Sequence, residues 1–206
     1  MEISKATLIR LPQYLRILKK LRKEKVETIS STTIAEKLTL NSIQVRKDLA
    51  LVSHEEGKPG IGFNVEELIK DLEKVLGLDN VSDAIIVGAG RLGQALLNYP
   101  GFEGNFNIVM AFDIDEEKCN GKNIFNINDI KEITKEKNIK IGIITVQKES
   151  AQQVCDLLIE CGIKAIWNFA PTRITVPEEI LIQNENMASS LAVLSKHLQN
   201  KIENEK

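Results

Sequence analysis

The stretch AIIVGAGRLGQAL, residues 84–96, decides the fold expected of this chain. Its apolar start, AIIVG, predicts a buried strand, and RLGQAL predicts a helix. Gly88, Gly90 and Gly93 stand between and within them in the spacing G-x-G-x-x-G. Behind a strand and at the start of a helix, this spacing is typical of a turn that binds a dinucleotide pyrophosphate. We therefore expect a dinucleotide-binding α/β domain.

Each glycine has a predicted role in that turn. Gly88 allows the tight turn, Gly90 lets the pyrophosphate approach the backbone, and Gly93 lets the helix pack close to the strand. Asp113 ends the next predicted strand, where a carboxylate would bind the adenosine ribose hydroxyls and favour NAD(H) over its 2′-phosphorylated form. The alternative is a plain glycine turn in an α/β domain.

The sequence from Val81 onward alternates between predicted strands and helices. Strands are expected at 84–88, 106–115, 139–146 and 163–171, and helices at 91–99, 128–137, 150–162 and 187–201. Continuous apolar strands separated by helices indicate a parallel sheet that is covered on both faces. This is a Rossmann-type arrangement.

Further cofactor contacts are expected in the glycine turn and at the carboxyl ends of the strands, where open α/β sheets bind ligands. Arg91 could lie over the phosphates or the adenine, or be a solvated arginine. The other candidates are Ala89, Leu92, Thr145, Val146, Asn168, Phe169, Ala170 and Pro171, the last six on the nicotinamide side. Pro171 could equally be a strand terminator.

The N-terminal third of the chain is basic and helical. Residues 1–60 hold 12 Lys and Arg against 7 Asp and Glu, a balance of +5, so the remaining residues must sum to −7. The apolar residues Leu11, Tyr14, Leu15, Leu18 and Leu21 repeat at helical spacing, with Pro12 expected in the first turn. A basic segment on an acidic body suggests contact with a polyanion, although basic helix faces are usually just solvated.

Residues 28–52 read as two short helices separated by the break TLN. Ser31 or Thr32 is the expected cap of the first helix, and Ser42 begins the second. Val45, Leu49 and Val52 face inward, so Lys47 points outward with Gln44 and Arg46 beside it. This is typical of a helix-turn-helix that binds a DNA major groove, and an ordinary helical hairpin with a charged surface is the alternative.

The segment EEGKPGIGFNV, residues 55–65, favours DNA binding over that alternative. Gly57, Pro59, Gly60 and Gly62 predict a tight β-hairpin, which after a recognition helix would be the wing of a winged helix. Lys58 at its tip could enter a neighbouring groove or contact a phosphate. An amphipathic helix follows, with Leu68, Leu72, Val75 and Leu76 inward, and ends at Gly77. We expect a domain boundary near residues 77–82.

Several classes of protein are disfavoured by the composition. Cys119, Cys155 and Cys161 form neither a disulfide framework nor a C-x-x-C metal pair, so a reduced cytoplasmic protein without a metal site is expected. No apolar run is long enough for a membrane span, and the N-terminus lacks a signal-peptide core. The two histidines, His54 and His197, lie far from the predicted strand ends, whereas a dehydrogenase normally needs an acid/base there.

Seven stretches of the chain together resemble the Rex family of redox-sensing transcriptional repressors. They include RLPQYLRIL, VRKDL, NYPGF and FDID, of which VRKDL and NYPGF are far more specific than the glycine spacing, and the resemblance spans nearly the whole chain in the same order. It implies a homodimer with an N-terminal winged helix, a Rossmann NAD(H) domain and a last helix that is swapped onto the partner. It also implies release of an A/T-rich, pseudo-palindromic operator when NADH replaces NAD⁺.

The resemblance also implies roles for particular residues. Arg46 and Lys47 would contact DNA from the recognition helix, and the wing at Lys58 to Gly60 would reach the minor groove. Tyr99 of NYPGF would lie near the nicotinamide. The complete set of expected DNA contacts is Arg10, Gln44, Arg46, Lys47, Lys58 and Gly60, and the expected switch residues are Arg16, Tyr99 and Asn186.

Two positions depart from the family pattern. Phe63 stands where the wing motif G-x-G-Y has a tyrosine, and Asn186 stands where the family often carries an aspartate that partners Arg16 or Tyr99. An amide accepts the same hydrogen bonds without the charge, and charge-assisted bonds are roughly twice as strong. We therefore expect weaker or altered discrimination between NAD⁺ and NADH, with cofactor binding retained.

Three functions are compared on this basis. The leading hypothesis is a repressor, not an enzyme, with a DNA-binding domain at residues 1–80, an NAD(H) domain at 81–185 and a dimerisation helix at 186–206. A small NAD-dependent oxidoreductase is the rival, and the missing acid/base opposes it. A CoA- or nucleotide-binding module without DNA affinity would leave VRKDL and the hairpin unexplained.

Overall fold

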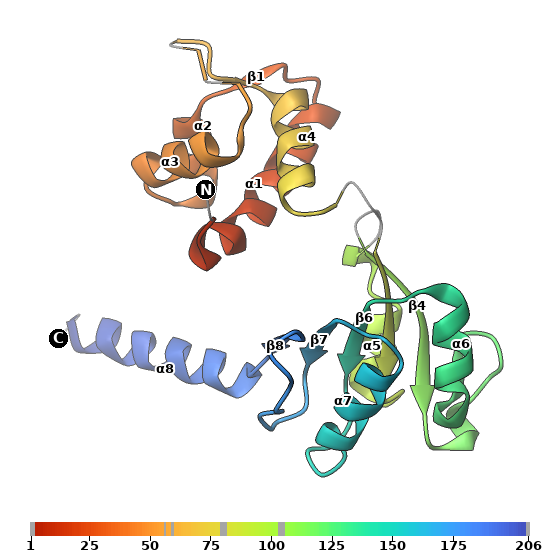
Figure 1. Ribbon diagram of the computed structural model, residues 1–206. Coiled ribbons are helices and arrows are strands. Elements are labelled where there is room, and N and C mark those ends of the chain that lie inside the picture. Colours follow the sequence, from red (N-terminus) through yellow and green to blue (C-terminus); the bar gives the residue numbers. More distant parts are fainter. Residues whose placement is uncertain (1–2, 56, 59, 79–81, 103–105, 205–206) are drawn as a thin grey trace. The chain divides into compact units, whose positions relative to one another are not determined.

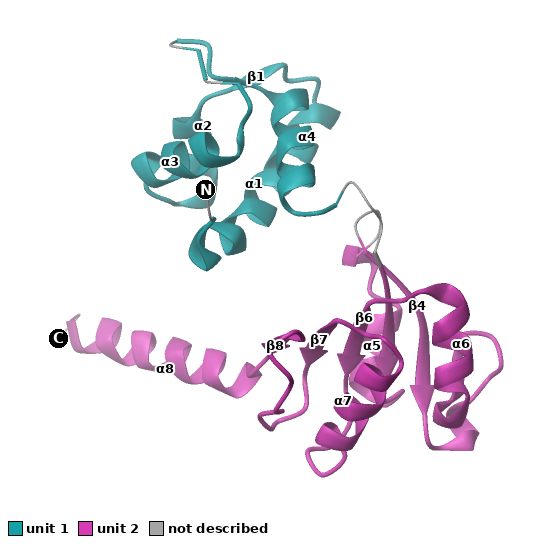
Figure 2. Ribbon diagram, viewed as in Figure 1, with its two compact units in different colours: residues 1–80 teal, residues 81–206 magenta. Residues whose placement is uncertain are grey.

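The computed structural model describes residues 3–55, 57–58, 60–78, 82–102 and 106–204. The chain forms two compact units, Met1–Asn80 and Val81–Lys206, which Figure 2 colours separately. The predicted boundary at residues 77–82 includes residues 79–81, which lie outside the described residues.

Unit 1 has the element order of a winged helix. It consists of α1 (Lys5–Lys23), β1 (Thr28–Ile29), α2 (Ser31–Leu38), α3 (Ser42–Val52), β2 (Phe63–Asn64) and α4 (Val65–Val75). Strands β1 and β2 pair antiparallel, so the segment between α3 and α4 returns to the strand that precedes α2. The helix-turn-helix is the pair α2 and α3.

The apolar stripe of α1 is buried as its spacing predicts. Leu11, Tyr14, Leu15, Leu18 and Leu21 all belong to the core of unit 1. The expected place of Pro12 is wrong, because α1 begins at Lys5 after the cap Ser4 and Pro12 lies inside the helix. Pro12 is exposed, so water can bind the carbonyl that its missing N–H leaves without a helical partner.

Both helices of the helix-turn-helix begin at capping side chains. Ser30 caps α2 by accepting a hydrogen bond from the Thr33 N–H at 3.0 Å, so the expectation of Ser31 or Thr32 is wrong by one or two residues. Asn41 caps α3 through the N–H groups of Ile43 and Gln44. The break TLN therefore ends in the cap of the helix that follows it.

The described residues after α3 include a bridge of the predicted β-hairpin. Lys58 and Gly62 form an antiparallel bridge, and Gly62 has a φ of +91°. A Cβ atom on Gly62 would overlap the Ile29 carbonyl, so this close approach to β1 requires glycine. Phe63 is partly buried and packs against the core of unit 1. Pro59 lies outside the described residues.

Unit 2 contains a six-stranded, fully parallel sheet in the order β5-β4-β3-β6-β7-β8. The strands are β3 (Ser82–Val87), β4 (Phe106–Asp113), β5 (Ile124–Asn126), β6 (Ile141–Ile144), β7 (Ala165–Asn168) and β8 (Leu181–Asn184). This is the Rossmann strand order, and its direction reverses between β3 and β6. The sequence predicts four of these strands, and β5 and β8 are additional.

Helices cover both faces of the sheet (Figure 1). α6 (Ile130–Lys137) and α7 (Ala151–Glu160) pack on the face that holds Ile85 and Val87. α5 (Arg91–Leu97) packs Leu96 and Leu97 on the opposite face, which holds Ala84 and Ile86. The glycine turn between β3 and α5 therefore opens at the carboxyl end of the central strand.

The last helix, α8 (Met187–Asn204), extends away from the sheet of unit 2 (Figure 1). None of its described residues is buried. Its large apolar side chains repeat at helical spacing and are all about half exposed or more: Met187, Leu191, Leu194, Leu198 and Ile202. A helix with such an exposed apolar stripe needs a surface to pack on.

Candidate functional site

The glycine turn has the geometry that its sequence predicts. Gly88 has a φ of +105°, and a Cβ atom there would lie 2.8 Å from the Thr145 carbonyl oxygen. A Cβ atom on Gly93 would overlap the Gly88 carbonyl, so α5 lies against the turn as closely as backbone allows. At Gly90 no atom lies within 4 Å of such a Cβ atom, so its missing side chain leaves open space.

A pocket of about 810 Å³ opens beside this turn. The turn contributes Gly88 and Gly90 to its lining, and the end of β4 contributes Asp113. Thr145 and Val146 line it from the end of β6, and the Thr145 hydroxyl donates a hydrogen bond to the Gly88 carbonyl oxygen at 2.7 Å. The pocket lies where the strand order reverses, which is where open α/β sheets bind ligands.

The Asp113 carboxylate lies within the turn as well as in the pocket. Its Oδ2 accepts a hydrogen bond from the Ala89 N–H at 2.7 Å, and its Oδ1 accepts one from the Asp115 N–H at 2.9 Å. The Lys118 Nζ lies 3.3 Å from each oxygen. The hydrogen bond and charge of Asp113 raise the pKa of Lys118 despite opposing desolvation. Because these contacts use the lone pairs of both oxygens, a ribose hydroxyl would have to share or displace Lys118.

The start of α5 is suited to an anion. Gly90 is its N-cap and supplies no side-chain hydrogen bond to the first turn. The N–H groups of a first turn have no partner within the helix, and they carry partial positive charge. Arg91 is exposed at this end, and Leu92 lies in the same turn. The open space at Gly90 and these donors fit a dinucleotide pyrophosphate.

The four predicted cofactor contacts at the end of β7, residues 168–171, do not line that pocket. Asn168 is fully buried. Its Nδ2 donates to the Thr172 carbonyl and to Asn184 Oδ1, and its Oδ1 accepts from the Ala170 N–H, each at 2.9 Å. Phe169 packs on Trp167, Ala170 is buried, and Pro171 is exposed. Asn168 therefore shapes the loop that leaves β7.

Aromatic contacts connect the NYPGF turn to the base of α8. The ring centroid of Tyr99 lies 5.0 Å from that of Phe102, which lies 6.1 Å from that of Trp167. The Trp167 indole N–H donates to Glu185 Oε1 at 2.9 Å. The next residue, Asn186, caps α8, because its Oδ1 accepts the Ser189 N–H at 3.0 Å.

The predicted switch residues lie in both units. Arg16 is exposed on α1 in unit 1. Tyr99, which is 55% exposed, and Asn186 belong to unit 2.

Helix α3 presents a polar outer face. Gln44, Arg46 and Lys47 are exposed, whereas Val45 and Leu49 are buried. The wing residues Lys58 and Gly60 are exposed as well. Basic and amide side chains on the exposed face of one helix can donate hydrogen bonds to base edges and phosphates in a major groove.

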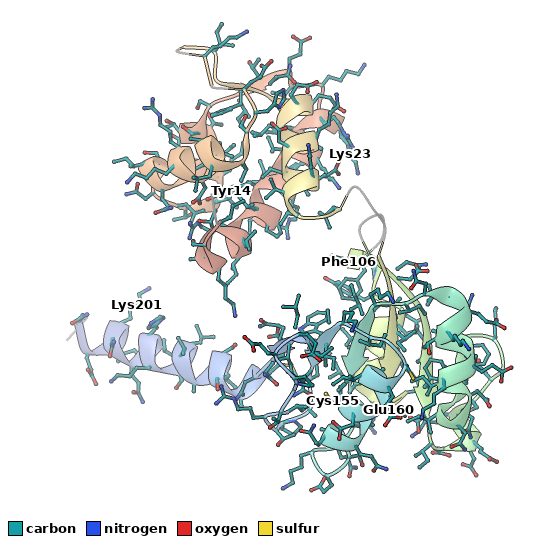
Figure 3. The ribbon with its side chains drawn as sticks, in the orientation of Figure 1. Tyr14, Lys23, Phe106, Cys155, Glu160 and Lys201 are labelled. Carbon is teal, nitrogen blue, oxygen red and sulfur yellow. The ribbon has the colours of Figure 1, made fainter. Side chains whose placement is uncertain are left out.

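Sequence reasoning missed a buried carboxylate in this helix. Asp48 is fully buried, although it belongs to the motif VRKDL. Arg10 donates to it from Nε at 2.7 Å and from Nη2 at 2.8 Å, and the Tyr14 hydroxyl donates at 2.7 Å. Figure 3 shows Tyr14 inside unit 1. The signal in the sequence is position, since Asp48 falls on the inward stripe with Val45 and Val52.

These contacts shift the ionisation of the cluster. Burial alone would raise the pKa of Asp48, but the hydrogen bonds from Arg10, Tyr14 and Gln44 outweigh it and lower that pKa. Burial and the Asp48 charge raise the pKa of Tyr14 to about 12. Arg10 and Gln44, both expected to contact DNA, thus also hold Asp48 inside unit 1.

A second ionic contact fixes the segment between α3 and the wing. The His54 Nδ1 lies 2.7 Å from the Asp71 carboxylate of α4, and the His54 backbone N–H donates to the same group at 3.0 Å. The hydrogen bond and charge of Asp71 raise the pKa of His54.

Residues that the sequence did not single out also line the pocket beside the glycine turn. Ile114, Lys118 and Lys131 are among them, and Ile114 is 80% exposed. A large apolar side chain left exposed directly after Asp113 is the one signal that could have found Ile114. The described residues contain no group of three or more His, Cys, Asp or Glu that could hold a metal ion. No described helix is long and apolar enough to cross a membrane.

Two family models match the chain. Residues 2–50 match a model described as a putative DNA-binding protein N-terminus, and residues 79–172 match one described as a CoA binding domain. The second match agrees with the Rossmann fold of unit 2.

Relatives match nearly the whole chain. A redox-sensing transcriptional repressor Rex from Thermoanaerobacter pseudethanolicus is 39% identical over 202 residues, which are 96% of this chain and 90% of that protein. A protein of the same name from Treponema denticola is 43% identical over 191 residues, 90% of each chain.

Solved structures of a Rex-family repressor called RSP have the same fold. RSP in complex with β-NAD⁺ and operator DNA is 37% identical, with a TM-score of 0.88 over 98% of this chain and 94% of that one. RSP in complex with β-NADH has a TM-score of 0.83 over 98% of this chain and 96% of that one. The chain described here therefore belongs to the Rex family of redox-sensing transcriptional repressors.

Proposed function

We propose that this chain is a DNA-binding transcriptional repressor whose operator affinity depends on the NADH/NAD⁺ ratio. The observation that carries the proposal is that one chain contains both a winged helix and an open glycine turn. The same two parts follow each other in a 37% identical repressor that was solved with β-NAD⁺ and operator DNA. As a repressor it would act in the cytoplasm, where bacterial DNA lies.

We assign operator binding to unit 1. Arg46 and Lys47 would contact base edges or phosphates from the exposed face of α3, with Gln44 beside them. Lys58 and Gly60 would contact the adjacent groove from the wing, and Arg10 would contact a phosphate from α1. Arg46 and Lys47 are the exposed residues of the motif VRKDL on α3.

We assign NAD(H) binding to the pocket beside the glycine turn. The backbone of residues 88–93 would hold the pyrophosphate, with Asp113 at the adenosine ribose and Thr145 and Val146 toward the nicotinamide. Tyr99 would lie at the nicotinamide end, and the residues after β7, from Asn168 to Pro171, would shape that end. The cofactor supplies two redox states that differ in charge and planarity at the nicotinamide.

The bound cofactor would be a signal and not a reagent. The ionisable side chains that line the pocket among the described residues are Asp113, Lys118 and Lys131, and neither histidine lies there. His54 contacts Asp71 in unit 1, and His197 lies on α8. An oxidoreductase most often uses a histidine as the proton donor or acceptor beside the nicotinamide. Turnover of the nicotinamide by the purified chain would favour the oxidoreductase instead.

We also propose that the chain forms a dimer in which the C-terminal segment, residues 186–206, is swapped. In this dimer α8 of each copy packs on the other copy. Its apolar stripe is exposed, and the face of β7 and β8 that carries Ala165, Trp167 and Leu181 is incompletely covered, since Leu181 is 73% exposed. Covering both surfaces with one helix would bury a continuous apolar patch.

Separation of the two activities by mutation tests the proposal. Lys47→Glu should abolish binding to the duplex that the wild-type chain selects from a randomised DNA library, and should leave NADH affinity unchanged by fluorescence titration. Lys70→Glu, an exposed lysine of α4, is the matched control for the charge change. Wild-type levels of DNA binding by Lys47→Glu would contradict the assignment of α3 as the recognition helix.

A further inference from the structure

The Asp48 carboxylate stands in the apolar stripe of α3 and is fully buried. Four side chains donate hydrogen bonds to it. Thr7 reaches Oδ1 at 3.2 Å and Gln44 reaches Oδ1 at 2.9 Å, in addition to the bonds from Arg10 and Tyr14. Three of the four donors come from α1, so this single carboxylate joins α1 to the recognition helix.

Stability alone does not explain a carboxylate at this place. A buried ion pair contributes little net stability compared with apolar residues of similar volume, because the desolvation of both charges offsets their attraction. What the cluster does provide is direction, since hydrogen bonds are directional and apolar contacts are not. Four of the five bonds to this carboxylate come from α1, and they define how α3 lies on α1.

The cluster also orients Arg10. Its Nε and Nη2 form a two-bond contact with both oxygens of Asp48, a geometry that fixes the plane of the guanidinium. The Arg10 side chain remains 21% exposed, and its Nη1 carries donors that these two bonds do not use.

We propose that Asp48 is a positioning residue of the DNA interface: it holds the Arg10 guanidinium and the axis of α3 in the orientation that the operator requires. The proposal rests on the proposed DNA-binding function. Asp48 itself contacts no DNA, because it is buried.

The positioning role and a simple charge effect predict opposite changes in DNA affinity for the same substitution. Asp48→Asn removes a negative charge from a unit that binds a polyanion, so charge alone predicts tighter DNA binding and a steeper salt dependence. A positioning role predicts the opposite for the selected duplex, because the neutral amide cannot pair with the Arg10 charge. The affinity for a scrambled duplex, which depends on charge alone, should stay equal or rise.

The experiment measures the affinity of wild type and Asp48→Asn for the duplex selected by the wild-type chain and for a scrambled duplex of the same composition, at several salt concentrations. We expect affinity for the selected duplex to fall about ten-fold or more, with little change for the scrambled one. Arg10→Met should add little to Asp48→Asn if the two act as one unit. Glu66→Gln removes the same charge from an exposed carboxylate of α4, and as the matched control it should bind the selected duplex as tightly as wild type or more tightly.

Thermal unfolding and NADH affinity are measured for every variant, so that loss of the fold is separated from loss of orientation. If Asp48→Asn does not fold, Tyr14→Phe replaces it, because it removes one donor and keeps the charge of Asp48. Its selected-duplex affinity should fall roughly three-fold. An unchanged ratio of selected to scrambled affinity in a folded variant would overturn the positioning role. If the wild-type chain selects no duplex, the proposed function fails and the inference fails with it.

Discussion

Three glycines within six residues have different physical requirements, which makes them separable by mutation. A methyl group at Gly93 would overlap the Gly88 carbonyl, whereas at Gly90 it would meet open space. The backbone of Gly90 has a φ of −74°, which any residue adopts. Gly93 is therefore required for the packing of α5 on β3, and Gly90 for the space beside the turn.

This difference predicts opposite phenotypes for two alanine variants. Gly90→Ala should unfold as the wild type does and bind NADH at least about ten-fold more weakly, because its methyl group stands where the pyrophosphate approaches the backbone. Gly93→Ala should lose about 1–3 kcal/mol of unfolding free energy, because α5 must move away from β3. Chemical denaturation and NADH fluorescence titration measure the two effects. Wild-type NADH affinity in Gly90→Ala would show that the turn does not hold the cofactor.

Asn186 is a second residue whose role is narrow enough to test. It caps α8, and an aspartate caps a helix about as well, so Asn186→Asp should leave α8 intact. The added charge should strengthen the switch contacts that the family resemblance implies. We therefore expect Asn186→Asp to release DNA at several-fold lower NADH, measured by mobility shift.

The control for that variant is Asn200→Asp, which adds the same charge on the exposed surface of α8. It should respond to NADH as the wild type does. Equal NADH sensitivity of the wild type and Asn186→Asp would refute a weakened switch in this chain.

At the scale of elements, contacts between helices fix the DNA-binding unit. Asp48 joins α3 to α1, and Asp71 of α4 holds His54 at the start of the segment that leads to the wing. Among the described residues, the His54 contact and the close approach of Gly62 to β1 hold the two ends of the wing segment.

The His54 contact predicts a pH dependence of stability. Because the pKa of His54 is raised in the folded chain, its contribution is fully present below its ordinary value of about 6.5 and is lost as pH rises through the higher folded value. The difference in thermal midpoint between wild type and His54→Gln should therefore shrink as pH rises from about 5.5 to about 8.5. His197→Gln on α8 is the control and should leave that dependence in place. A difference that stays constant with pH would show that protonated His54 does not stabilise unit 1.

Long periodic elements could be predicted from the sequence, and short ones could not. The stripe of α1 and the alternation of strands with helices follow from hydrophobic periodicity, which extends over many residues. β5 and β8 have only three and four residues, which is too short for a hydrophobic period to be recognised. They form because they pair with β4 and β7, and periodicity does not reveal strand pairing. Pro12 is not in the first turn, because α1 already begins at Lys5 behind the cap Ser4.

At the scale of the whole molecule, each unit carries one proposed site, and α8 is left with an exposed apolar stripe. Leu191 and Leu194 at the centre of the stripe are 66% and 63% exposed. An isolated helix of this kind gains stability only when its apolar face is covered. A dimer in which each α8 packs on the other chain would cover it.

Charge placed on that stripe should therefore dissociate the dimer. Leu191→Glu with Leu194→Glu should convert the chain to monomers in sedimentation experiments, since two carboxylates would be buried in an apolar contact. Lys196→Gln with Asn200→Glu changes the net charge by the same −2 on the opposite face of α8, and should remain dimeric. Dimers of the first variant that match the wild type would contradict the swapped arrangement.

The part of the cofactor site that could be predicted consists of residues that are close in sequence or that follow the end of a strand. The glycine turn, Asp113, Thr145 and Val146 do lie around one pocket, because parallel strands end at one edge of the sheet. The partners of Asp48 and Glu185 could not be predicted, since Arg10 and Trp167 are distant from them in sequence. Lys118 follows Asp113 by only five residues, but no pattern in the sequence marks their contact. Asn168 supports the loop that leaves β7, and its expected place near the cofactor stays a prediction.

Coupling between the two proposed sites is the central claim, and it requires that NADH bind more tightly to the form that does not bind DNA. The most direct test measures the affinity of the full chain for its selected duplex at a fixed, saturating total of NADH plus NAD⁺ while their ratio is varied. DNA affinity should fall steadily as the fraction of NADH rises, and Gly90→Ala should show a weaker response. DNA affinity that stays the same from pure NAD⁺ to pure NADH would contradict a redox-sensing repressor.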